Sequence, residues 1–373
     1  MIPFLTLALA EDAPVVEEAI ARVVARGWFV LGPELEAFER EYAAACGAGH
    51  AVGVGTGTDA LAIALRAMGI GPGDEVITSP LSATYSALAI LMAGARPVFA
   101  DIDPERLTIA PEAVAAAVTS RTAAVLPVHL YGQAADMPAI AAVATRHGLA
   151  ILEDCCQAHL ATCRGRPVGS FGAAAAYSFY PTKNLGALGD AGALTTSDEA
   201  LAARARRIRN GGQTSRYHHA EFGVNSRLDE IQAAVLRARL PLLAGWTDRR
   251  RTLAGHYRNL LADVPTVLVP PEADRGHVYH LFPVRSVLRA EMQAHLRSSG
   301  VETLIHYPVP IPCQPVMADQ HPADCPVANR VSGEVLSLPL YPALGHDAIR
   351  QVVDAVAGGP SAAASRHERH AHS

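Results

Sequence analysis

The feature that most constrains this chain is a regular alternation of short β-rich runs with helical stretches between residues 50 and 200. The runs are apolar along most of their length, which is typical of strands buried on both faces of a parallel sheet. Such strands are joined by helices that cover the sheet, so the sequence predicts an α/β fold with a mostly parallel sheet. The expected strands are 51–55, 75–79, 97–101, 123–129, 149–155, 174–180 and 192–196, and the expected helices are 59–69, a stretch ending near 92, and 136–147.

Beyond about residue 197 the pattern becomes helical, and a second alternation begins near residue 250. There, 278–286 predicts a strand and 289–299 a helix. The 373 residues exceed what one hydrophobic core usually serves. We therefore expect a large domain over 1–245, which starts with an arm of about 30 residues, and a small α/β domain over 246–360. The polar end, 361–373, is expected to be disordered.

Charge and composition exclude several classes of partner. The formal net charge is −5, and the chain has no basic stripe or polybasic tail, so neither nucleic acid nor an anionic membrane is an expected partner. The first residues lack the basic start and long apolar run of a signal peptide, and no apolar run is long enough to span a bilayer. The expected location is the cytoplasm.

The cysteines predict neither a disulfide scaffold nor a metal site. Cys155, Cys156, His159 and Cys163 form a C-C-x-x-H-x-x-x-C cluster. Structural zinc sites separate paired cysteines by two to four residues, and no second pair follows this cluster. Six cysteines in a chain of this length are instead typical of reduced, partly buried thiols.

Lys183 is the only lysine among the 31 Lys and Arg residues. A GC-rich genome that converts lysine to arginine explains the scarcity. However, arginine cannot replace lysine as a primary amine that loses its proton and forms an imine. Lys183 follows a predicted strand in a glycine-rich loop, which makes it a candidate nucleophile; a surface lysine in a loop is the alternative interpretation.

Two further segments bring polar groups to strand ends of the same predicted sheet. The turn at 55–58 leaves backbone N–H groups free at a helix start, so Gly57 and Thr58 form a candidate anion site, although a plain strand–turn–helix connection has the same pattern. Asp154 ends an apolar strand at the edge where open α/β sheets bind ligands. A carboxylate about 4 Å from a protonated ring nitrogen attracts that nitrogen with an energy on the order of 4 kcal/mol. An Asp that caps a helix or faces solvent is the alternative interpretation. With Ser178 and Lys183, these are the groups that a pyridoxal-phosphate site needs.

Several motifs carry a family resemblance from about residue 31 to 342. They are LGPELEAFE, GTGTDAL, PVHLYGQAADM, LEDCCQAHL, SFYPTKNLGALGD, GVNSRLDEIQAA, LIHYPVP and LSLPLYP. With these motifs the chain resembles the DegT/DnrJ/EryC1/StrS family of sugar aminotransferases, which are fold-type I pyridoxal-phosphate enzymes. The resemblance implies transfer of an amino group from glutamate to a nucleotide-linked keto-deoxysugar of the kind used in antibiotic biosynthesis. The LIHYPVP stretch resembles members that act at the third carbon, which favours a 3-keto over a 4-keto sugar.

The resemblance also implies residue roles and a homodimer with shared active sites. Lys183 bonds to the cofactor and later moves protons at the substrate carbon, while Asp154 pairs with the pyridine nitrogen. The implied cofactor-binding residues are Gly57, Thr58, Asp154, Gln157, Ser178, Lys183 and Asn225, with Gln157 near the ring hydroxyl and Asn225 reaching the phosphate from the neighbouring subunit. The implied substrate-binding residues are Arg227, His306 and Tyr307.

Some positions depart from the family pattern. The usual ring-stacking aromatic stretch is replaced by Leu81-Ser82-Ala83, with Tyr85 two residues further on, the usual Ala-Ala is Cys155-Cys156, and the usual glycine after His159 is Leu160. These departures leave open a keto-cyclitol acceptor, a lyase or cyclisation reaction, or a non-catalytic regulatory protein that binds the cofactor. The dehydratases of the family carry histidine in place of the lysine, so Lys183 argues against that branch.

Overall fold

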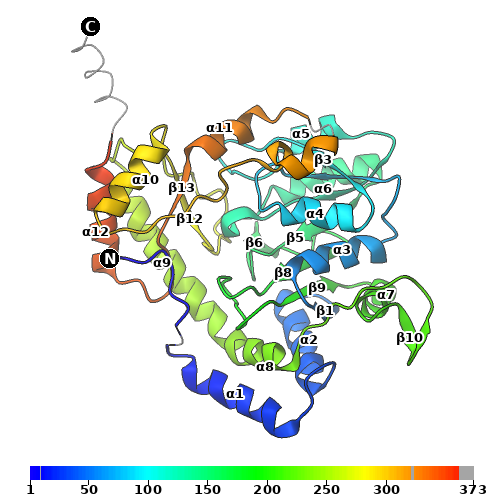
Figure 1. Ribbon diagram of the computed structural model, residues 1–373. Coiled ribbons are helices and arrows are strands. Elements are labelled where there is room, and N and C mark those ends of the chain that lie inside the picture. Colours follow the sequence, from blue (N-terminus) through cyan, green and yellow to red (C-terminus); the bar gives the residue numbers. More distant parts are fainter. Residues whose placement is uncertain (9, 321–322, 361–373) are drawn as a thin grey trace.

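A computed structural model describes residues 1–8, 10–320 and 323–360, so the expected disordered end at 361–373 lies outside the described residues. A seven-stranded sheet with the order β1-β9-β8-β5-β4-β2-β3 forms the centre of the fold (Figure 1). Strand β9 is antiparallel to both of its neighbours, and the remaining pairs are parallel. The expectation of a mostly parallel, mixed sheet is confirmed. The strands of this sheet are β1 (His50–Val54), β2 (Glu75–Thr78), β3 (Arg96–Phe99), β4 (Thr122–Leu126), β5 (Ala150–Asp154), β8 (Ala174–Ser178) and β9 (Gly192–Thr196).

Helices cover both faces of the sheet, and three two-stranded ribbons lie outside it. The helices are α1 (Ala13–Arg26), α2 (Pro33–Cys46), α3 (Gly57–Ala67), α4 (Tyr85–Met92), α5 (Pro111–Ala117), α6 (Met137–His147), α7 (Glu199–Arg209), α8 (Glu230–Arg239), α9 (Leu243–Leu261), α10 (Arg289–Ser298), α11 (Pro326–Glu334) and α12 (His346–Ala357). The ribbons pair β6 (Thr162–Cys163) with β7 (Arg166–Pro167), β10 (Gln213–Ser215) with β11 (His218–His219), and β12 (Phe282–Arg285) with β13 (Val335–Leu338).

The ends of the helices follow from local chemistry. Helix α3 begins at Gly57 because the Thr56 hydroxyl accepts the N–H of Asp59 at 3.0 Å. Helix α6 ends at Gly148, whose φ of 66° lies in the left-handed region that glycine adopts without steric cost. The helix expected at 59–69 therefore starts two residues earlier, and it stops at Ala67.

The strand expected at 278–286 is wrong in its first half, because β12 begins only at Phe282. Tyr279 has a φ of 46°, in the left-handed region, so the backbone turns there instead of extending. The ring of His277 stacks on that of Tyr279, and its Nδ1 accepts the Tyr279 N–H at 2.9 Å. These local contacts outweigh the β-propensity of the VYHLF run.

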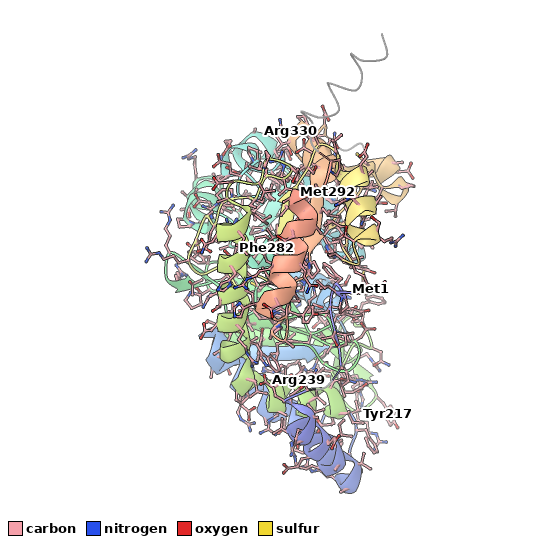
Figure 2. All side chains as sticks on the ribbon, turned by 90° about the vertical axis from the view of Figure 1, so that its left-hand side faces the viewer. Met1, Tyr217, Arg239, Phe282, Met292 and Arg330 are labelled. Carbon is pink, nitrogen blue, oxygen red and sulfur yellow. The ribbon has the colours of Figure 1, made fainter. Side chains whose placement is uncertain are left out.

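Apolar side chains pack into two large clusters against the sheet and a third around β12 and β13. Phe282 and Met292 of the third cluster lie in the upper half of Figure 2, and Arg239 lies in the lower half. Part of the C-terminal segment, including Ile311 and Val331, joins a sheet cluster instead of the third one. The division into domains near residue 245 stays a prediction. Among the described residues, no helix is both long enough and apolar enough to cross a membrane.

Candidate active site

The turn between β1 and α3 has the geometry of an anion cradle. Gly57 and Thr58 open α3, and their N–H groups have no acceptor among the described residues, because the Thr56 cap takes only the amide of Asp59. A Cβ at Gly57 would lie 2.7 Å from the Ser178 Cβ and 2.8 Å from the Cys156 Sγ. Two of the predicted phosphate ligands, Gly57 and Ser178, therefore pack directly against each other where only glycine fits, and the third, Thr58, follows Gly57 in the same turn.

Asp154 is held at the end of β5 with its carboxylate buried and only 4% exposed. The Ser86 hydroxyl of α4 donates to its Oδ2 at 2.8 Å, and the Cys156 N–H donates to its Oδ1 at 3.1 Å. The buried acid is therefore fixed in orientation and poised to pair with a cation.

Lys183 lies in the loop after β8, on the same side of the sheet. Burial lowers the pKa of its amine below the usual 10.5, and the nearby Cys156 and Asp154 oppose this shift. The segment around Val278 and His280 anchors this loop, because the Asn184 side chain donates to the carbonyl of Val278 at 3.0 Å and its Oδ1 lies 3.2 Å from His280 Nδ1. A lowered pKa enlarges the fraction of neutral amine, which is the nucleophilic form.

Gln157 links two of the segments that carry predicted site residues. Its Oε1 accepts the backbone N–H of Tyr131 at 2.7 Å, and its Nε2 donates to the Tyr307 hydroxyl at 3.0 Å. The Tyr131 hydroxyl in turn donates to the carbonyl of His306. The structure thus brings the predicted residues Gln157, His306 and Tyr307 together.

Burial determines the protonation of the two substrate-side residues. Burial, reinforced by the charge of Lys183, lowers the pKa of His306 to about 4, and its Nδ1 lies 2.9 Å from the Ser337 hydroxyl. Burial raises the pKa of Tyr307 to about 12, although the bond from Gln157 opposes this. Both groups are neutral at physiological pH and act there as hydrogen-bonding groups.

Asn225 and Arg227 have other neighbours within a single chain. Asn225 is exposed, and Arg227 Nη1 donates to Asn210 Oδ1 at 3.2 Å. Ser226, between them, accepts the N–H of Gly55 at 2.9 Å and donates to Asp59 at 2.7 Å. The segment therefore touches the β1–α3 turn of its own chain, and delivery of Asn225 to a neighbouring subunit stays a prediction.

The residues that depart from the family pattern lie in several parts of the fold. Ala83 is half-buried just before α4, while Tyr85, the first residue of α4, is 62% exposed and directly precedes Ser86, whose hydroxyl contacts Asp154. Leu160 has a φ of 57°, the left-handed conformation that favours glycine. This explains why glycine is the residue expected there and shows that the chain tolerates leucine.

The cysteines are all free thiols, and three buried groups, His129, Glu153 and Cys155, approach one another as metal ligands would. Hydrogen bonds already occupy two of the three. His129 Nε2 lies 3.1 Å from Glu153, and its Nδ1 accepts the N–H of Ala135 at 3.1 Å. Glu153 also accepts three backbone N–H groups from residues 169–172. This cluster holds the 169–172 loop against the strand that carries Asp154.

Sequence reasoning missed Ser86, Tyr131 and His280. Ser86 lies 68 positions from Asp154, and Tyr131 lies 26 from Gln157, so nothing in local periodicity connects these pairs. The only available signal for Tyr131 was the glycine beside it in LYGQ, which indicates a turn.

The residues present fit pyridoxal phosphate, because the cradle excludes any Cβ, a buried carboxylate is oriented by donors, and an amine of lowered pKa lies beside it. Together with the mixed sheet, they define a fold-type I pyridoxal-phosphate enzyme. The chain belongs to the DegT/DnrJ/EryC1/StrS aminotransferase family, whose model matches residues 12–357. It is a pyridoxal-phosphate-dependent aminotransferase.

Relatives match over nearly the whole chain. The "Erythromycin biosynthesis sensory transduction protein EryC1" of Saccharopolyspora erythraea is 48% identical over 367 residues, which are 96% of this chain and 99% of that protein. The "dTDP-3-amino-3,4,6-trideoxy-alpha-D-glucose transaminase" of Streptomyces venezuelae is 48% identical over 360 residues, 95% of each chain. The crystal structure of S. venezuelae DesV has a TM-score of 0.92 at 48% identity, covering 95% of this chain and 97% of that one. The structure of NtdA from Bacillus subtilis with bound cofactor PMP has a TM-score of 0.90 at 31% identity, covering 95% and 84%.

Proposed function

We propose that this aminotransferase moves an amino group from glutamate to a keto-deoxysugar carried by a nucleotide, at the third carbon of the sugar. The observation that carries the proposal is a half-buried Lys183 of lowered pKa beside the buried Asp154, in a chain whose relatives include nucleotide-sugar transaminases. Relatives named as dTDP-3-amino and 3-dehydro sugar enzymes favour the third carbon. The names of the relatives also support a setting in deoxysugar biosynthesis, including that of antibiotics.

Each half of the reaction needs a proton to be moved at the carbon that gains or loses the amino group. Bound pyridoxal phosphate supplies an electron-accepting ring and an aldehyde. Lys183 would hold that group and carry the proton, since a neutral amine is available at its lowered pKa. Asp154 would keep the ring nitrogen protonated. Gly57, Thr58 and Ser178 would hold the phosphate through N–H and O–H donors.

His306 and Tyr307 would orient the sugar without exchanging protons with it. Both are neutral at physiological pH because burial moves the pKa of the first to about 4 and of the second to about 12. Gln157 donates to the Tyr307 oxygen, so the Tyr307 hydroxyl keeps its own hydrogen to offer to an oxygen of the sugar.

We further propose a homodimer in which a second copy of this chain completes each site. The exposed Asn225 has no contact with the phosphate cradle of its own chain, while Ser226 anchors the segment to that turn. Asn225 would reach the partner's phosphate group, and Arg227 would face the partner's substrate.

The test is the isolated half-reaction with glutamate. Glutamate added to the holoenzyme should bleach the cofactor's visible absorption and yield one 2-oxoglutarate per site. The resulting amino form should then react with a panel of nucleotide 3-keto and 4-keto sugars, with the 3-keto sugars faster. A cofactor spectrum that no amino donor changes would favour a regulatory binding protein, and turnover of only keto-cyclitols would replace the proposed acceptor.

A further inference from the structure

A cavity of about 600 Å³ lies between the N-terminal arm, the Lys183 loop and the start of α9. Its walls include Leu5 and Leu7 of the arm, Lys183, Trp246, Arg250 and Tyr341. A volume of this size falls in the range of small-molecule sites, and the wall mixes apolar with a few polar groups as such sites do. The cavity reaches the loop of the reactive amine.

Two of the cations in this wall are already neutralised by the arm. Asp12 accepts from Arg239 at 2.8 Å. Glu11 pairs with Arg249 and accepts from the Trp246 indole N–H at 2.6 Å. These ion pairs fasten the arm over the cavity and leave no net charge on either pair.

Arg250 is different, because its charge has no counter-ion. The residue is only 4% exposed, and among the described residues no carboxylate lies at ion-pair distance from it. Within the described part of the chain its hydrogen bonds all start from Nη1 and go to the carbonyls of Tyr279 at 3.2 Å, His280 at 3.4 Å and Leu340 at 2.9 Å. Its Nε is buried without a partner. Burial lowers the pKa of Arg250 to about 10, so the group is still charged at neutral pH.

A purely structural role explains part of this arrangement. The three carbonyl bonds tie α9 to the chain entering β12 and to the chain after β13. Carbonyl dipoles do not cancel a full charge, however, and the bonds use one of the three guanidinium nitrogens. An unpaired buried cation is costly unless an anion completes it.

We propose that Arg250 binds a carboxylate of the amino donor and that this cavity is the donor's subsite, an inference that rests on the proposed function. Apart from the reactive Lys183, Arg250 is the one cation of this wall without a carboxylate partner among the described residues, and one such cation matches one carboxylate better than a doubly charged pyrophosphate. The cavity also borders the reactive loop, because Lys183 and Asn184 line it, and His280 contacts both Arg250 and Asn184. A small dicarboxylic amino acid would place one carboxylate at Arg250 and its amine towards Lys183.

The experiment uses Trp246 as a reporter, since it lines the cavity and Trp28 is the only other tryptophan. In a Trp28→Phe holoenzyme, glutarate, which has both carboxylates of glutamate but no amine, should change the Trp246 emission saturably. Neutral glutaramide should not. Arg250→Gln should weaken glutarate binding at least tenfold, while Arg250→Lys should keep part of it. Emission that glutarate leaves unchanged, or equal affinity in Arg250→Gln, would overturn the proposal.

A second measurement needs no Arg250 variant and so remains decisive if that variant does not fold. Glutarate should raise the KM for glutamate in the half-reaction without changing kcat. Glutarate that alters Trp246 emission but does not compete with glutamate would reject the donor subsite while leaving the proposed function intact. Tighter binding of inorganic pyrophosphate than of glutarate would also reject the donor subsite and would indicate that the cavity binds the pyrophosphate of the nucleotide sugar. Failure of glutamate itself to react would instead contradict the proposed function.

Discussion

Replacement of Gly57 by alanine tests the cofactor cradle most directly. Its φ does not lie in the left-handed region, so alanine can adopt the backbone, and the whole effect is steric. The new methyl group would lie 2.7 Å from the Ser178 Cβ and 2.8 Å from the Cys156 Sγ, well inside contact distance. Relief requires the turn and β8 to separate, which moves apart Gly57 and Ser178, two of the three predicted phosphate ligands. Overpacking of this kind costs about 1–3 kcal/mol.

If that cost falls on the bound state, the Kd for pyridoxal phosphate should rise roughly 5- to 150-fold, since about 1.4 kcal/mol is a factor of ten. Titration of the apoprotein with cofactor, followed by absorbance, measures the change. Gly255→Ala is the matched control, because its Cβ would meet nothing within 4 Å and it lies inside α9. That control should bind normally and unfold at a slightly higher Tm. Parental affinity in Gly57→Ala would refute the assignment of this turn.

Three further outcomes follow from the site. Ser86→Ala removes the donor that lies 2.8 Å from the Asp154 carboxylate and should slow the glutamate half-reaction roughly tenfold or more, since a hydrogen bond to a charged group is worth about 1.5–3 kcal/mol. The rate of Ser86→Thr should be nearly unchanged, because its hydroxyl can still donate, and an equal loss of rate in both variants would contradict this role. In the apoprotein, stability should rise with pH through the window between the lowered Lys183 pKa and 10.5, because only the unfolded chain holds that proton there. Lys183→Met should therefore be more stable than the parent at neutral pH, with a difference that closes as the pH approaches 10.5; a difference independent of pH in chemical unfolding would speak against burial as the cause. Because the pKa of His306 is lowered to about 4, the pH profile of kcat/KM should show no step near pH 6.5 that comes from this residue. A step near pH 6.5 that disappears in His306→Asn would show instead that the ring titrates normally.

Much of the fold was readable from the sequence because its signals are local. The strand ending at Asp154 and the helix ending at Gly148 each depend on a few consecutive residues, and the structure has them within one residue of the expectation. The predicted start of the strand at residue 278 was wrong because its signal is not local. Its start depends on the conformation of Tyr279, which is set by stacking and packing that periodicity does not describe.

The residues of the site also fall into those that the sequence reveals and those that it does not. Gly57 and Lys183 stand out in the sequence, one by its turn and the other as the single lysine. Ser86 and Arg250 do not, because a serine in an apolar helix and an arginine in an Arg-rich helix are unremarkable until their long-range neighbours are known. Whether an arginine lacks a counter-ion is a property of the packed interior and has no signature in a linear chain.

A chain with one lysine also has one bond that a lysine-specific endoprotease can cut. Digestion of the denatured protein should give two fragments, 1–183 and 184–373, and nothing else. Once borohydride has fixed the cofactor to that side chain, the protease no longer recognises it, and the polypeptide should stay whole. Gel mobility alone would then report what fraction of a preparation carries its cofactor.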